Sequence, residues 1–287
     1  MDNRQVIAGH SLSRRRALRI AGAGSAAALA TGFVVPARAG WDVRSSQDAT
    51  PETEGTPDAL ATPSATGETG PFSLPNLPYE TDALAPTISE ETMALHHGVL
   101  HRLHVDLLNL SIQGVPDVEG LTLEELQSNL ALIPNDEIQD LEGAVQPRPN
   151  VFLLNAGGHY NHSLFWETMS PDGGGDPTGD IADAIDTSFG DFDTLKETMR
   201  DAAIANPGSG WVWVASDAAG ALAVVATRDQ NNPLTDGLGY PVFGIDHWEH
   251  SYLFDYGAQR GQYILSWFDV ANWDEINNRY AAALGQE

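Results

Sequence analysis

Histidine is the residue type best suited to chemistry in this chain, and eight of its nine copies lie beyond residue 90. They fall in three short segments, each with at least two histidines: 96–104, 159–162 and 246–250. In the third segment, Asp246 and His250 are spaced so that a carboxylate and an imidazole can meet one metal ion. The chain contains no cysteine, so any metal site must use nitrogen and oxygen ligands, and zinc fingers, iron–sulfur clusters and thiolate nucleophiles are excluded.

Spacing within the first segment does not by itself choose the ligands. A single helical stripe contains three of its histidines at i, i+4 and i+7: His97, His101 and His104. His96 lies about 100° away on a more apolar face, with three leucines: Leu100, Leu103 and Leu107. From spacing alone the stripe is the stronger candidate. The aromatic residues near the histidine segments indicate an apolar site, and a nitrogen and oxygen ligand set suits iron, manganese or zinc.

The elements that must position these residues follow from periodicity and from end signals. Helices are expected over 89–112, 121–132, 150–169, 181–188 and 192–205. Thr122 and Glu125 have the spacing of a capping box at the start of the second helix. The period then changes, and β-prone runs over 211–215 and 222–227 flank a turn at 217–220, which predicts a hairpin. A third strand fits 241–245, and helices from about 261 and 273 close the chain. The pattern predicts a helical N-terminal half and an α+β C-terminal half.

The first forty residues have the pattern of an export signal. Arg14 and Arg15 precede an apolar stretch over 20–35, and the small-x-small sequence at 37–39 resembles a cleavage site. The arginine pair resembles the twin-arginine type, and the apolar stretch falls short of the roughly 20 residues that a spanning helix needs. We expect a signal peptide over 1–39, whose removal leaves a periplasmic, cell-surface or secreted protein without a membrane anchor.

Composition limits the partners of the chain. Residues 40–70 consist largely of Ser, Thr, Pro, Gly and acids, which predicts a disordered linker. The whole chain has 40 acidic and 14 basic residues, for a net charge of −26. Such a surface repels nucleic acid and anionic lipid, so neither is an expected partner. The acidity favours adaptation to high salt, where screening weakens self-repulsion, over the binding of cationic partners.

From Phe72 to Tyr280 the chain resembles the iron/manganese superoxide dismutase family. Seven motifs carry this resemblance in order along the chain: LPYETDAL from Leu77, TMALHH from Thr92, NAGGHYNHSLFW from Asn155, GSGWVW from Gly208, DQNNPL from Asp229, DHWEHSY from Asp246 and NWDE from Asn272. The resemblance implies an α+β fold. An N-terminal α-helical hairpin domain is expected over 71–170, and a C-terminal domain with a three-stranded antiparallel sheet and helices over 171–287.

The resemblance also implies the activity, which is conversion of superoxide to dioxygen and hydrogen peroxide at one redox-active metal per subunit. The implied ligands are the following residues: His96, His162, Asp246 and His250. This set uses the first histidine of the pair at 96–97 and so replaces the stripe favoured by spacing. A fifth position belongs to water or hydroxide, whose partner is a glutamine. In the family this glutamine stands at one of two positions, which distinguish manganese from iron enzymes. Gln230 occupies the position typical of manganese enzymes, and the position typical of iron enzymes is a glycine here, Gly158. Manganese is therefore favoured over iron.

Further roles and two departures follow from the same resemblance. Trp166 and Trp248 are expected to wall the site, and Glu249 to reach across an interface to a ligand histidine of a partner subunit, in a homodimer or homotetramer. His104 stands where the family has a tyrosine, and as a donor its charge would change near neutral pH. The family usually has polar residues at the gate through which the substrate reaches the metal. Two of these positions are leucines here, Leu100 and Leu253. Between 112 and 151 the chain is longer than is usual in the family, which predicts a surface loop.

Two other functions remain open from the sequence. An exported protein with this fold and weak or no dismutase activity would serve a binding or structural role, and the altered gate favours it. A zinc hydrolase would use the same ligands, but Gln230 stands where a hydrolase needs a general base. Bound metal and dismutase activity distinguish these alternatives from a dismutase.

Overall fold

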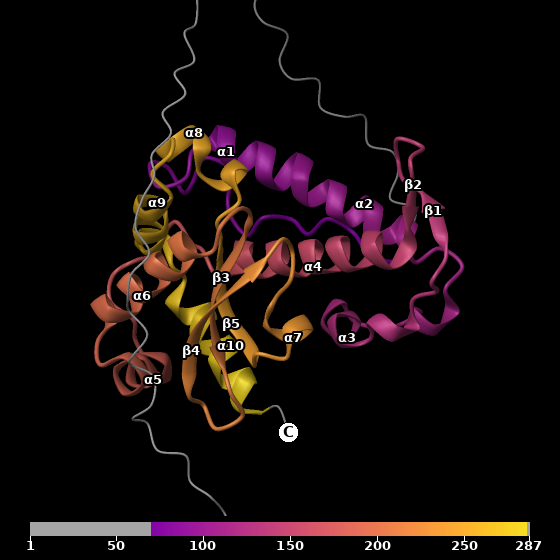
Figure 1. Ribbon diagram of the computed structural model, residues 1–287. Helices are drawn as coiled ribbons and strands as arrows, with labels where there is room; N and C mark the ends of the chain where they lie inside the picture. Colours follow the sequence, from indigo (N-terminus) through magenta and orange to yellow (C-terminus); the bar gives the residue numbers. More distant parts are fainter. Residues whose placement is uncertain (1–69, 286–287) are drawn as a thin grey trace, which may run out of the picture. The chain divides into compact units, whose positions relative to one another are not determined.

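The computed structural model describes residues 70–285. The expected signal peptide over 1–39 and all of the 40–70 linker except Gly70 lie outside the described residues. Figure 1 shows a helical N-terminal part and a C-terminal part in which helices surround a sheet, so the α+β prediction is confirmed. Within residues 70–285, no helix is both long enough and apolar enough to cross a membrane.

The first long helix is built from three consecutive segments, namely α1 (Glu90–Leu95), the π-helical η1 (His96–His101) and α2 (Arg102–Ser111). It begins at Ser89, whose hydroxyl accepts a hydrogen bond from the Thr92 amide at 3.2 Å, as an N-cap does. The π segment has a wider turn than an α-helix, so it rotates the residues that follow. In this part of the helix His96 is buried, whereas Leu103 is 43% exposed.

Between this helix and the next long one, the chain forms a short helix and a small hairpin. Thr122 and Glu125 form the predicted capping box of α3 (Leu123–Ser128). Strands β1 (Glu137–Gln139) and β2 (Val145–Pro147) then pair antiparallel, in the region where the sequence predicts only a surface loop. The Arg148 side chain closes the base of the hairpin, because its Nε donates to Asp136 at 2.6 Å and its Nη1 to the Ser111 carbonyl at 2.8 Å.

Helix α4 (Arg148–Glu167) packs along α2 and passes through the middle of the molecule (Figure 1). It starts directly after Pro147 and has Pro149 in its first turn, where a missing backbone N–H costs nothing. A small core between α2, α3 and α4 contains Leu108, Leu126 and Phe152. The larger core lies around the sheet. There Trp211 stacks on Trp213 and Phe243 stacks on Trp267.

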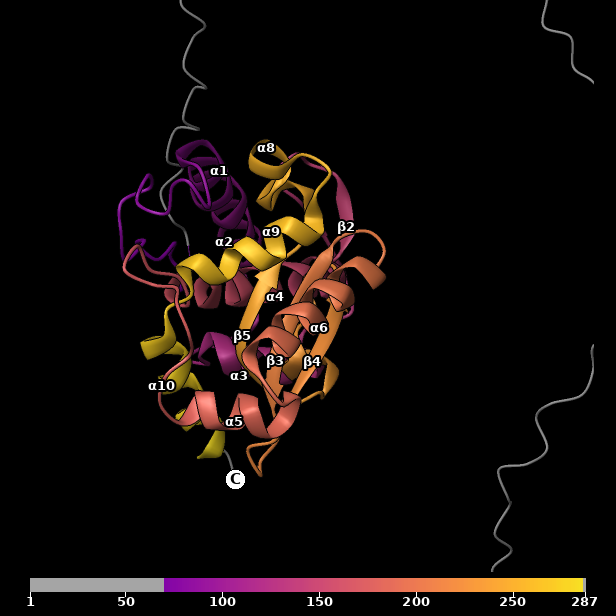
Figure 2. The same ribbon diagram turned by 90° about the vertical axis from the view of Figure 1, so that its left-hand side faces the viewer.

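The C-terminal part holds a three-stranded antiparallel sheet of order β4-β3-β5. Its strands are β3 (Gly210–Ser216), β4 (Leu222–Arg228) and β5 (Tyr240–Asp246). The surrounding α-helices are α5 (Asp180–Phe189), α6 (Phe192–Ala205), α7 (Pro233–Asp236), α8 (Leu253–Tyr256), α9 (Arg260–Trp267) and α10 (Trp273–Leu284). Short 3-10 segments are η2 (Pro116–Val118), η3 (Leu130–Leu132), η4 (Glu249–Ser251) and η5 (Phe268–Val270). Helix α6 packs on β3 and β4 and lies in front of them in Figure 2, whereas α10 packs on β5.

The central strand β3 is buried at every position, which explains its continuous apolar sequence. Its register with β5 places Trp211 opposite Asp246. The end of β5 therefore delivers a carboxylate into the aromatic core, beside α4 and the start of η1.

Candidate metal centre

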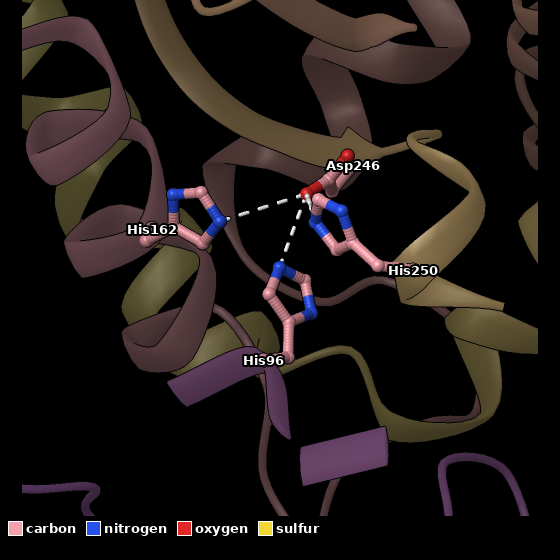
Figure 3. A group of neighbouring side chains, drawn as sticks. All are labelled: His96, His162, Asp246 and His250. Carbon is pink, nitrogen blue, oxygen red and sulfur yellow. Dashed lines mark hydrogen bonds and ion pairs between the residues drawn. The ribbon is translucent and has the colours of Figure 1, made fainter. Parts of the chain in front are cut away.

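Four side chains from four separate segments converge at this point (Figure 3). They are His96 of η1, His162 of α4, Asp246 at the end of β5 and His250 of η4. One ligand atom from each lies within 4.8 Å of the others. The Asp246 Oδ2 atom is 3.1 Å from the His96 Nε2 atom, 3.3 Å from that of His250 and 3.7 Å from that of His162. In residues 70–285 no other group of three or more histidine and acidic side chains has this geometry.

Local hydrogen bonds orient two of these side chains. His162 Nδ1 donates to the Gly158 carbonyl one turn earlier in α4, at 2.6 Å. A neutral imidazole carries one proton, so the His162 Nε2 atom presents a lone pair to the centre. The second carboxylate oxygen of Asp246, Oδ1, accepts the Trp248 amide at 2.8 Å. That bond leaves Oδ2 directed at the three imidazoles.

The donor set fits a manganese or iron ion. The Nε2 atoms of His162 and His250 are buried and have no hydrogen-bond partner among the described residues. A buried polar atom without a partner is costly, and a bound cation satisfies both lone pairs at once. Three imidazoles and one carboxylate form a hard to borderline set that suits these two metals.

Burial favours the neutral form of His96 and His162, and contacts with histidine favour the ionised form of Asp246. Burial lowers the pKa of His96 to about 4 and that of His162 well below its ordinary value. Burial alone would raise the pKa of Asp246, but its close contacts with His250 and His96 hold it well below its usual range. Because metal ligands must be deprotonated, these shifts favour metal binding at neutral pH.

Aromatic rings enclose the four side chains. Trp166 packs edge-on against His96 with ring centroids 4.9 Å apart, and Trp211 packs in the same way against His162 at 5.3 Å. Trp248, which is partly exposed, lies 5.7 Å from His250. The structure therefore brings both predicted wall residues, Trp166 and Trp248, against the histidines. Such apolar surroundings lower the local dielectric and strengthen each charge interaction.

Gln230 is buried beside this centre and its amide is firmly held. Its Oε1 accepts hydrogen bonds from the Trp211 indole at 2.9 Å and from Asn161 Nδ2 at 3.2 Å. Sequence reasoning missed Asn161, although its place next to His162 in a motif was a usable signal. At Gly158 a Cβ atom would lie 2.5 Å from the His104 ring, so a glutamine side chain does not fit there.

His104 lies beside the four converging side chains. Asn155 directs its Nδ2 at the Val151 carbonyl and therefore turns its Oδ1 toward His104, whose Nδ1 donates to it at 2.9 Å. The His104 ring lies 5.3 Å from that of His162. Burial lowers the pKa of His104 below its ordinary value.

The rest of the predicted histidine stripe does not join the centre. His97 Nε2 donates to the Pro75 carbonyl at 2.8 Å, and His101 pairs with His159 at 2.8 Å. Both histidines therefore have protein partners, and the stripe suggested by spacing alone is not a metal site. Glu249 is exposed on η4 and forms no side-chain hydrogen bond among the described residues.

Comparison with known proteins agrees with this geometry. The model of the iron/manganese superoxide dismutase α-hairpin domain matches residues 71–170, and that of the C-terminal domain matches residues 177–279. "Superoxide dismutase [Mn] 3" of Leptolyngbya boryana is 41% identical over 217 residues, which cover 76% of this chain and 86% of that protein. "Superoxide dismutase [Mn]" of Listeria innocua is 43% identical over 212 residues, which cover 74% and 98% of the two chains. The chain therefore belongs to the iron/manganese superoxide dismutase family and catalyses the dismutation of superoxide with a manganese or iron cofactor.

Proposed function

We propose that this dismutase uses one manganese ion per subunit, held by four residues: His96, His162, Asp246 and His250. The observation that carries the ligand assignment is the convergence of two unpartnered, buried Nε2 atoms on the Asp246 carboxylate. Gln230 and Gly158 support manganese over iron, since the glutamine is held at the manganese-type position and a side chain at Gly158 would meet the His104 ring. The names of the two relatives above point to the same metal.

When bound, the metal supplies the one-electron steps that oxidise one superoxide to dioxygen and reduce a second. The second superoxide also takes up two protons and leaves as hydrogen peroxide, so two superoxide ions and two protons are consumed in all. Asp246 contributes the negative charge of the site. Gln230, with its Oε1 fixed by Trp211 and Asn161, keeps its Nε2–H groups free to donate toward the solvent position. Such hydrogen bonds tune the redox behaviour of a metal site.

The test is metal analysis by mass spectrometry together with a dismutase assay on protein purified from its own host. About one manganese per chain with activity is expected. Activity with iron alone would overturn the manganese assignment and keep the ligands. A filled site without activity would favour the exported binding or structural protein. Zinc without activity calls for reconstitution with manganese, and a reconstituted protein that stays inactive would reject the proposal.

We also propose that the chain is exported through the twin-arginine pathway and that residues 1–39 are removed. The support is the arginine pair, the apolar stretch and the small-residue site in the sequence. Export of a folded protein would let the metal be inserted beforehand. Replacing Arg14 and Arg15 by lysine should retain the protein in the cytoplasm with residues 1–39 still present, and N-terminal sequencing of the exported form should start near Gly40. Normal export of the double variant would reject this pathway.

We further propose a homodimer, or a tetramer of such dimers, in which Glu249 approaches a ligand histidine of the partner subunit. Leu253 and Phe254 on α8 are 49% and 55% exposed, next to the segment that carries Glu249 and His250. Exposed apolar residues beside a functional site are typical of an interface. Sedimentation analysis should show at least a dimer, and Glu249→Gln should weaken it. A monomer at micromolar concentration with full activity would contradict this assembly.

A further inference from the structure

Four buried side-chain amides form one continuous hydrogen-bonded chain that ends at Gln230. Its members are Gln127 of α3, Asn232 before α7, Asn161 of α4 and Gln230 after β4, and none is more than 2% exposed. The two ends of an amide differ, because the oxygen only accepts and the nitrogen only donates. Each link of the chain therefore fixes the orientation of the next.

The orientation of the first amide follows from main-chain carbonyls. Gln127 Nε2 lies 3.0 Å from the Leu123 carbonyl and 3.2 Å from the Ala156 carbonyl. Carbonyls only accept, so the nitrogen must face them. The Gln127 Oε1 atom is thereby the end that faces Asn232, which lies 3.1 Å away.

The orientation of Asn232 follows from main-chain amides. As the N-cap of α7, its Oδ1 accepts the amide N–H groups of Leu234 and Thr235, each at 3.1 Å. Its Nδ2 must then be the donor to Gln127 Oε1 and to Asn161 Oδ1, the latter at 3.0 Å. The first two amides are thus anchored independently, Gln127 by main-chain carbonyls and Asn232 by backbone N–H groups.

The same logic reaches Gln230. Because Asn161 Oδ1 faces Asn232, Asn161 Nδ2 faces Gln230 and donates to its main-chain carbonyl at 3.0 Å and to its Oε1 at 3.2 Å. The indole N–H of Trp211, which can only donate, reaches the same Oε1. The Gln230 oxygen is therefore fixed on this side, and its Nε2–H groups face away from Trp211 and Asn161.

We infer that Gln127 and Asn232 are positioning residues for the dismutase reaction, which act through Asn161 to set which end of the Gln230 amide faces the metal centre. The inference rests on the role proposed above for Gln230. A reversed Gln230 amide would present an acceptor where a donor is required. The hydrogen-bonded series of amides also links the two parts of the molecule. Gln127 lies in the region that matches the α-hairpin domain, and Asn232 lies in the region that matches the C-terminal domain.

The sharpest test is Asn232→Asp, which keeps the size of the side chain and its capacity to cap α7 but replaces the donor by an acceptor. The new oxygen would face Asn161 Oδ1 and Gln127 Oε1, and the repulsion should push the Asn161 amide away and disturb its two hydrogen bonds to Gln230. Trp211 reports this directly, because its indole N–H shares the Gln230 Oε1 acceptor with Asn161. In full-length protein loaded with diamagnetic zinc, the Trp211 indole ¹⁵N–¹H resonance should shift. In the manganese enzyme kcat should fall about tenfold or more, and the reduction potential should change.

A second variant and a matched control accompany this measurement. Gln127→Met removes the acceptor of Asn232 at the far end, together with the donor to the Leu123 and Ala156 carbonyls, but introduces no repulsion. A smaller shift of the Trp211 resonance in the same direction is therefore expected. Asn277→Asp is the control, because Asn277 Nδ2 likewise faces two carbonyls, those of Thr178 and Trp273, and its Oδ1 likewise accepts a backbone N–H. The control should lower thermal stability yet leave the Trp211 resonance and kcat unchanged.

The outcomes separate this inference from the proposal on which it rests. An unchanged Trp211 resonance and an unchanged potential in folded Asn232→Asp would overturn the inference. If that variant does not fold, an unchanged resonance in Gln127→Met would overturn it. A shifted Trp211 resonance supports the amide chain in every case. If kcat is then unchanged, both in this variant and in Gln230→Leu, the proposed role of Gln230 is rejected while the amide chain stands.

Discussion

The indole Nε1 of Trp166 donates a 2.9 Å hydrogen bond to Nδ1 of His101, and both side chains are buried. Because the indole only donates, His101 Nδ1 must be the acceptor and its proton must lie on Nε2. That Nε2–H donates in turn to His159 Nδ1 at 2.8 Å. His101 is therefore held in one tautomer, and through this bond it fixes the indole that packs against His96.

We expect His101→Leu to lower the free energy of unfolding by about 1–3 kcal/mol, because it leaves the buried Trp166 N–H without an acceptor. His101→Gln should be milder, since the glutamine oxygen can accept from Trp166 and its nitrogen can donate to His159. Urea unfolding of the metal-loaded protein measures both effects. Equal destabilisation by the two variants would show that the ring volume matters and that the hydrogen bond does not.

His162 and His97 provide a matched pair for testing the ligand assignment. His162→Gln removes a buried Nε2 lone pair from the centre, so the manganese content should fall well below one per chain and the activity should be lost with it. His97→Gln changes only a ring that bonds to the Pro75 carbonyl, and the metal content should persist. Metal analysis of both variants distinguishes the assigned ligand set from the histidine stripe. Loss of metal in His97→Gln alone would support the stripe suggested by spacing.

Removing the metal should destabilise the protein, because Nε2 of His162 and of His250 then lack a hydrogen-bond partner among residues 70–285. A ligand that binds only the folded state stabilises it in proportion to the logarithm of its concentration over Kd. Calorimetry should therefore show a lower Tm after chelation and recovery on addition of manganese. The Asp246→Asn variant, which removes the negative charge, should respond much less to the added metal. An identical Tm with and without metal would contradict the assigned site.

Periodicity and turn signals predicted the long helices and the three sheet strands closely, whereas the helix expected over 121–132 ends at Ser128. The π segment His96–His101 was missed, because a wider turn changes the phase of a pattern that is interpreted at the α-helical period. Strands β1 and β2 were missed because each has only three residues and neither is buried at any position. Without a buried face, a strand carries no alternation to detect.

The candidate site was predicted through resemblance and not through spacing. Spacing favoured the stripe because it could not reveal that His97 and His101 meet the Pro75 carbonyl and His159, which lies 58 positions from His101. The amides of Gln127 and Asn232 were missed for a related reason. Their partners are distant in sequence, and an amide has no spacing pattern that marks it as a positioning group.

Gly158 offers a test of how tightly α4 meets the first helix. A Cβ atom there would lie 2.5 Å from the His104 ring, so Gly158→Ala should cost about 1–3 kcal/mol of stability through overpacking. In a His104→Ala background the same change should be nearly neutral, and a double-mutant cycle of unfolding free energies measures the difference. Gly98→Ala is the control, because nothing lies within 4 Å of its added Cβ. An equal cost in both His104 backgrounds would contradict the contact.

The ion pair between Asp136 and Arg148 at the base of the β1–β2 hairpin should make the stability of the protein depend on pH in the acid range. Hydrogen bonding to Arg148 holds the pKa of Asp136 below its ordinary value of 3.8. A carboxyl group whose pKa is lower in the folded state contributes stability above its unfolded pKa, and this contribution disappears as the pH falls through the folded pKa. The Tm difference between the native chain and Asp136→Asn should therefore be present at neutral pH and vanish in acid. Asp140→Asn, at the exposed turn of the same hairpin, is the control for general charge effects. A Tm difference that persists unchanged at low pH would show that the charge of Asp136 does not anchor the hairpin.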